Sequence, residues 1–83
     1  MNRDWVLFHL AEAADALRQA IKEISDAPDY GDPEFSVDMQ HIYHHINTAW
    51  NSRNSDPSDV EPGSDALFTA WSKLPVDLEM MAL

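Results

Sequence analysis

The 83-residue sequence contains no cysteine, only two glycines and only five basic residues. Without cysteine the chain has no disulfide framework, no thiolate nucleophile and no cysteine-type zinc site. Two glycines are too few for a glycine-rich phosphate loop, and no Gly-x-Ser-x-Gly turn is present. Five Lys and Arg against 15 Asp and Glu give a formal charge of −10, which excludes the clustered basic contacts that nucleic acid requires. These absences predict a non-enzymatic protein that does not bind nucleic acid.

Long apolar runs are also missing. The apolar run nearest the N-terminus, residues 5–8, is too short for a signal peptide, and no segment approaches the ~20 apolar residues that span a bilayer. We therefore expect a cytoplasmic protein without a membrane partner. A hydrophobic content of 45% excludes an intrinsically disordered chain. The length predicts a single small domain, residues 1–83, whose core is limited.

Residues 3–25 carry the pattern of an amphipathic helix. Such a pattern predicts a helix that packs against another helix along its apolar seam. Val6, Ala13 and Ala20 lie beside this seam, where their small size would let a neighbouring helix approach closely. Asn2 is the expected N-cap. The seam residues recur at steps of three and four: Leu7, Leu10, Ala14, Leu17, Ile21 and Ile24.

A second helix is predicted over residues 33–53, after a loop that contains Pro28 and Gly31. Asp32 followed by Pro33 favours a helix start with Asp32 as the N-cap. Two helices of similar length joined by a short loop are expected to pair antiparallel as an αα-hairpin. The seam of this second helix is Phe35, Met39, Ile42, Ile46 and Ala49.

The rest of the chain is expected to cover this hairpin only in part. Residues 54–64 form a polar linker, residues 65–74 a short third helix, and residues 75–83 a short tail. Aligning the two seams sets Leu17 beside Ile42. The expected fold is therefore an all-α antiparallel hairpin with a short third helix, and two such hairpins would complete a four-helix bundle as a dimer.

Histidine is the residue type that could carry chemistry, because three of the four histidines stand close together in the second helix. On that helix Asp38, His41 and His45 share one stripe, and this set could hold zinc or another divalent metal. No zincin or di-iron motif accompanies the stripe, so metal binding is an alternative and no cofactor is expected. The predicted pairing places His9 near Trp50, away from the stripe.

Large aromatic residues are candidates for a contact surface, because tryptophan is enriched at binding hot spots. Phe8 falls off the seam of the first helix, where a neighbouring element or a partner would cover it. We predict a protein–protein interaction module that self-associates as a homodimer. An alternative is an acidic inhibitor or immunity-like protein that binds a basic partner through residues 26–34 and 56–61. The candidate interface residues are Trp5, Phe8, Trp50, Phe68 and Trp71.

Overall fold

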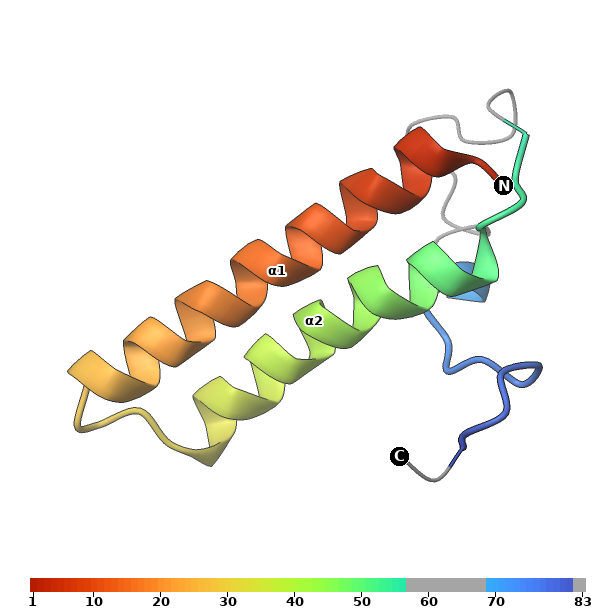
Figure 1. The fold of residues 1–83 in the computed structure, drawn as a ribbon. Helices are drawn as coiled ribbons and strands as arrows, with labels where there is room; N and C mark the ends of the chain where they lie inside the picture. The colour runs from red at the N-terminus through yellow and green to blue at the C-terminus, as the bar shows by residue number, and fades with distance from the viewer. Residues whose placement is uncertain (57–68, 82–83) are drawn as a thin grey trace.

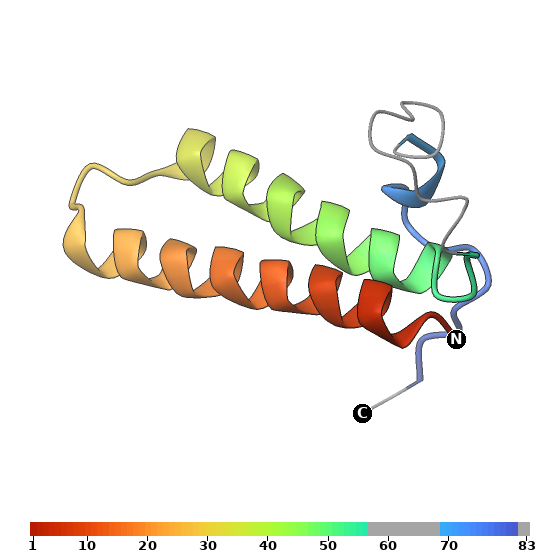
Figure 2. The same ribbon diagram turned by 90° about the horizontal axis from the view of Figure 1, so that it is seen from above.

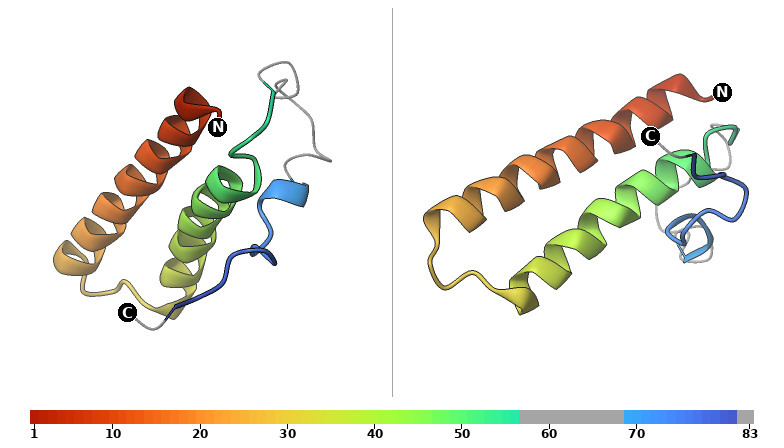
Figure 3. Two further views of the ribbon diagram at one scale, coloured as in Figure 1. Left: turned by 45° about the vertical axis from the view of Figure 1, so that its right-hand side comes forward. Right: turned by 60° about the horizontal axis from the view of Figure 1, so that its bottom comes forward.

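The structure, a computed structural model, describes residues 1–56 and 69–81 of the chain. Helices α1 (Arg3–Asp26) and α2 (Asp32–Asn51) lie side by side and antiparallel, joined by a short loop (Figure 1). Residues 69–71 form a further helical turn, and the segment that follows lies beside α2 (Figure 3). The predicted all-helical hairpin is confirmed, and the two described ranges contain no strand. The start of the predicted third helix at residue 65 lies outside the described residues.

The N-terminus of each helix is capped by a different device. Asn2 Oδ1 accepts the backbone N–H of Trp5 at 3.3 Å, which confirms the N-cap predicted for α1. The N-cap predicted for α2 is wrong by one residue, because Asp32 is the first helical residue and Gly31 precedes it. Glu34 Oε2 reaches back and accepts the Gly31 N–H at 2.9 Å. This carboxylate binds the cap residue, so the start of α2 does not depend on the Asp32 side chain.

Replacing the first of these caps should weaken the hairpin measurably. Asn2 caps α1 through its side chain, and its backbone N–H donates to the Arg53 carbonyl at 2.7 Å. In Asn2→Ala the backbone bond persists and the cap is lost, so we expect the free energy of unfolding to fall by about 1 kcal/mol. Urea unfolding monitored by circular dichroism measures this change. Asn2→Asp, which keeps a capping oxygen, should restore most of the loss.

The contact between α1 and α2 differs from the predicted one on α1, whereas Ile42 and Ala49 of the predicted α2 seam are buried as expected. On α1 the buried residues are His9, Ala13 and Ala20, and they face a stripe of α2 that includes Ile42 and Ala49. Small side chains let the two backbones approach closely, so the residues beside the predicted seam pack in its place. The large seam residues of α1 are 44–64% exposed: Leu7, Leu10, Leu17, Ile21 and Ile24.

The pairing register also differs from the prediction, by about one helical turn. The aligned seams predict His9 near Trp50, whereas in the structure His9 contacts His45. The Asn2–Arg53 hydrogen bond fixes the same register at the open end of the hairpin.

In the described part of the chain, neither helix combines the length and the apolarity that crossing a membrane requires.

Candidate functional site

The exposed seam of α1 continues onto α2 as one surface. Successive residues of an α-helix are rotated by about 100° around its axis. On this basis, the exposed apolar residues of each helix lie to one side of its contact stripe, and the sense of rotation from the stripe is the same in both helices. Because the helices are antiparallel (Figure 2), this displacement places both sets on the same side of the hairpin. We name this surface the apolar face. It consists of Leu7, Leu10, Leu17, Ile21 and Ile24 of α1 and Phe35, Tyr43 and Ile46 of α2, which are 41–64% exposed.

Acidic side chains avoid the apolar face. The two helices contain eight Asp and Glu residues, and only Asp32, at the first residue of α2, projects to that side. The negative charge of the helices is therefore carried almost entirely elsewhere. The seven acids that project to other sides are Asp4, Glu12, Asp15, Glu23, Asp26, Glu34 and Asp38.

The histidines gather on the opposite side of the hairpin, where α1 and α2 meet. His9 Nδ1 and His45 Nδ1 are 2.9 Å apart, and His45 Nε2 and His41 Nε2 are 3.1 Å apart. His45 thus bridges α1 to the preceding turn of α2, and we name His9, His45 and His41 the histidine chain. The ring of His44 lies 4.7 Å from that of His45. The prediction that His9 lies away from the other histidines is wrong, because the register is shifted by a turn.

Burial favours the neutral forms of His9, His44 and His45. Burial, together with the charges of His45 and His44, lowers the pKa of His9 to about 4. Burial and the charges of His44 and His41 lower the pKa of His45. The carboxylate of Glu12 raises this pKa but offsets only part of the shift. Burial also lowers the pKa of His44. At neutral pH each short contact is therefore a hydrogen bond between one N–H and one nitrogen lone pair.

The structure brings His41 and His45 together but does not add Asp38 to them. Asp38 Oδ2 accepts the hydroxyl of Tyr30 at 2.6 Å, so the carboxylate is held by the loop between the helices. Among residues 1–56 and 69–81, no group of three or more His, Asp or Glu side chains is placed to hold a metal ion. The ligand set predicted for zinc or another divalent metal is therefore not assembled around one point.

The predicted aromatic residues lie largely in contacts within the chain. Trp5 Nε1 donates to Ser52 Oγ at 2.7 Å, and the Trp5 ring packs edge-on against Trp71 at 6.2 Å between ring centroids. Phe8 is exposed and stacks on Trp5, on the histidine side of the hairpin. Phe68 lies outside the described residues. The apolar face is thus a different and more extended surface than the predicted aromatic one.

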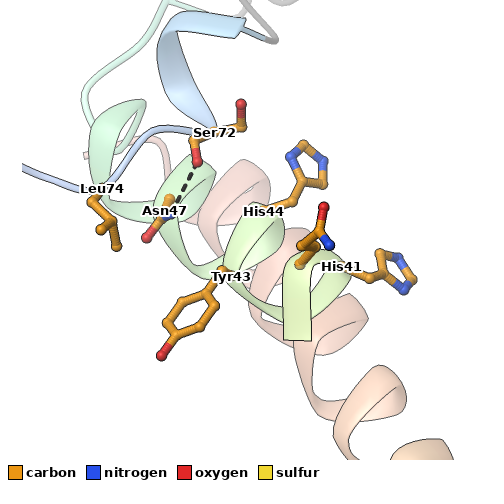
Figure 4. Close-up of a pocket in the computed structure, with 7 residues that line it drawn as sticks. His41, Tyr43, His44, Asn47, Ser72 and Leu74 are labelled. Atoms are coloured by element: carbon orange, nitrogen blue, oxygen red, sulfur yellow. Dashed lines mark hydrogen bonds between the residues drawn. The ribbon is translucent and has the colours of Figure 1, made fainter. Parts of the chain in front are cut away.

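Polar side chains on the outer side of α2 hold the C-terminal segment. Asn47 Nδ2 donates to the Ser72 carbonyl at 2.9 Å (Figure 4), and Asn51 Nδ2 donates to the Trp71 carbonyl at 2.8 Å. Trp50 Nε1 donates to a carboxylate oxygen of Asp77. Binding of the C-terminal segment by Asn47 and Asn51 was not predicted from the sequence. Their i, i+4 spacing, which places both amides on one face of the helix, could have indicated it. The groove beside this segment is lined by Gln40, His41, Tyr43, His44, Asn47, Ser72 and Leu74.

Known proteins give no guide to these features. Comparison of the chain with protein-family models, with curated proteins and with solved structures finds no match in any of the three. Function must therefore be inferred from the two features that the hairpin itself presents, the apolar face on one side and the histidine chain on the other.

Proposed function

We propose that this protein is a helical protein–protein interaction module that self-associates through its apolar face. The observation that carries the proposal is the exposure of eight large apolar side chains on one side of a two-helix hairpin. Monomeric proteins rarely leave a contiguous apolar patch larger than a few hundred Å² uncovered. Two hairpins related by a twofold axis would cover both patches at once and form a four-helix bundle.

The accessible surface of the chain is larger than expected for a monomeric protein of its mass. The chain exposes 6410 Å², whereas a monomeric protein of 9.4 kDa is expected to expose about 5,000 Å². Val76 and Met80 in the C-terminal segment are almost fully exposed, and the eight residues of the apolar face are 41–64% exposed. The excess is about 1,400 Å² and a standard interface removes about 800 Å² from each partner, so the excess is large enough to include one dimer contact.

The charge distribution favours a second copy over a basic partner at this face. A basic partner is attracted by carboxylates, and seven of the eight helical acids project away from the apolar face. In the proposed bundle the acids of both copies lie on the outside, where salt screens their repulsion beyond about 10 Å. An acidic inhibitor that binds a basic partner would have to use the loops or the outer sides of the helices.

Sedimentation equilibrium over a dilution series tests the proposal. We expect a mass of twice 9.4 kDa at high concentration, which falls toward the single-chain mass on dilution. Because each chain carries a charge of −10, added salt should strengthen the dimer by screening repulsion. A mass that stays at 9.4 kDa at the highest concentration would refute self-association. A dimer that salt dissociates would instead indicate an ionic contact and contradict the role of the apolar face.

A further inference from the structure

The histidine chain has a fixed capacity for protons. Three imidazoles have six ring nitrogens, and four of these form the contacts of 2.9 and 3.1 Å. Each contact needs one N–H and one lone pair, so each holds one proton. The remaining nitrogens are His9 Nε2 and His41 Nδ1, at the two ends of the chain. Three neutral imidazoles carry three protons, so two lie in the contacts and the third lies on one of the two ends.

The buried end of the chain decides where the third proton sits. Within the described residues His9 Nε2 is buried without a hydrogen-bond partner, and the aromatic rings of Trp5 and Phe8 pack edge-on against the His9 ring. A buried N–H without an acceptor is costly, whereas His41 is exposed and its N–H can bind water. The proton therefore sits on His41 Nδ1. It follows that His9 Nδ1 donates to His45 Nδ1, and that His45 Nε2 donates to His41 Nε2.

Added protons cannot enter this chain freely. With both contacts intact, one added proton must end on His9 Nε2, which is buried and has no partner among the described residues. A second added proton must break a contact, because no bare nitrogen is left. From α2, His44 and His41 disfavour charge on His45, and from α1 the carboxylate of Glu12 acts in the opposite sense. Protonation of the histidine chain therefore competes with the two hydrogen bonds that hold it together.

We propose that the histidine chain is a proton-operated latch, which holds the N-terminal half of α1 on α2 while neutral and releases it in acid. The latch lies one turn from the Trp5–Ser52 hydrogen bond, so its opening would loosen the open end of the hairpin first. The latch is a contact within one chain, and its opening does not depend on self-association through the apolar face.

The sign of the pH dependence follows from the folded and unfolded pKa values. Burial lowers the pKa of His9 from 6.5 to about 4, so the unfolded chain binds more protons than the folded chain between these values. The stability that the neutral latch contributes is therefore fully present above pH 6.5 and is lost as the pH falls toward 4. The lowered pKa of His45 acts in the same direction.

Urea unfolding of the full chain at pH 7, 6 and 5 tests the latch against the variant His9→Leu/His45→Leu. Removing both rings leaves no buried imidazole without a partner, and the exposed His41 can bind water in place of His45, so the double variant should fold. Between pH 7 and 5 the unfolding constant of the wild type should rise about 20-fold more than that of the variant, from His9 alone. Both proteins carry the same 15 carboxylates, so their contribution cancels. The control His44→Gln should keep most of the wild-type pH dependence.

Local measurements on the wild type make the test independent of the variants. Imidazole NMR titration should give a pKa of about 4 for His9 and a pKa below 6.5 for His45. Amide protection from hydrogen exchange should fall in the first turns of α1 before it falls near Ala20 when the pH is lowered from 7 to 5. Ordinary pKa values for both histidines, a uniform loss of protection, or parallel unfolding curves for wild type and double variant would each overturn the latch.

Discussion

Two glutamates in the apolar face should convert the proposed dimer into a folded monomer. In Leu17→Glu/Ile21→Glu, each chain brings two carboxylates into the proposed interface. An unpaired charge buried there costs several kcal/mol, so the dissociation constant should rise at least about a hundredfold. Sedimentation equilibrium measures this change. Circular dichroism should show the same helix content, because both side chains are already exposed in the single hairpin.

A charge-matched variant separates the effect of position from the effect of added charge. Ala11→Glu/Gln19→Glu introduces the same two charges on exposed sides of α1 that lie outside the apolar face. We expect its dissociation constant to stay close to that of the wild type. If both double variants dissociate to the same extent, general repulsion is responsible, and the apolar face is not the interface.

Local signals in the sequence predicted the helices closely. Helices expected over residues 3–25 and 33–53 are observed as Arg3–Asp26 and Asp32–Asn51. Apolar periodicity and the breakers between the helices act within a few residues, so they can be recognised without knowledge of the tertiary contacts. The cap of α2 was misplaced because two acids, Asp32 and Glu34, were both able to satisfy the helix start.

The contact between the helices could not be chosen from periodicity alone. α1 carries two stripes at helical spacing, a large aliphatic one and a smaller one that contains His9, Ala13 and Ala20. The gain from burying apolar area favours the larger stripe, whereas close backbone approach favours the smaller one. The sequence of one chain does not say which stripe meets its own second helix. Under the proposed dimer both are buried, one within the chain and one between chains.

The candidate site was predictable only where it is local. The proximity of His41 and His45 follows from their i, i+4 spacing on one helix. The participation of His9 depends on the register of α1 against α2, and the aligned seams misplace that register by a turn. Asp38 has the right spacing for the stripe, but the hydroxyl of Tyr30, which comes from the loop, binds its carboxylate. The spacing of Asp38, His41 and His45 along the helix does not reveal such a competing contact from the loop.

Leucine substituted at two alanines of α1 should distinguish the two stripes. Ala20 is buried in the helix contact, so Ala20→Leu must push the helices apart and should lower the free energy of unfolding by about 1–3 kcal/mol. Ala14 lies among the residues of the apolar face and is only half-buried, so Ala14→Leu should leave that free energy nearly unchanged.

These free energies are best measured by urea unfolding in the monomeric Leu17→Glu/Ile21→Glu background, because dimer formation would otherwise add to the apparent stability. In the wild-type background, Ala14→Leu should also tighten the proposed dimer, since it adds apolar area to the face that a second copy would cover. If Ala14→Leu lowered the free energy of unfolding more than Ala20→Leu does, the aliphatic seam, and not the alanine stripe, would pack against α2. The surface available to a second copy would then be the smaller stripe, which lacks the apolar area that a stable dimer requires.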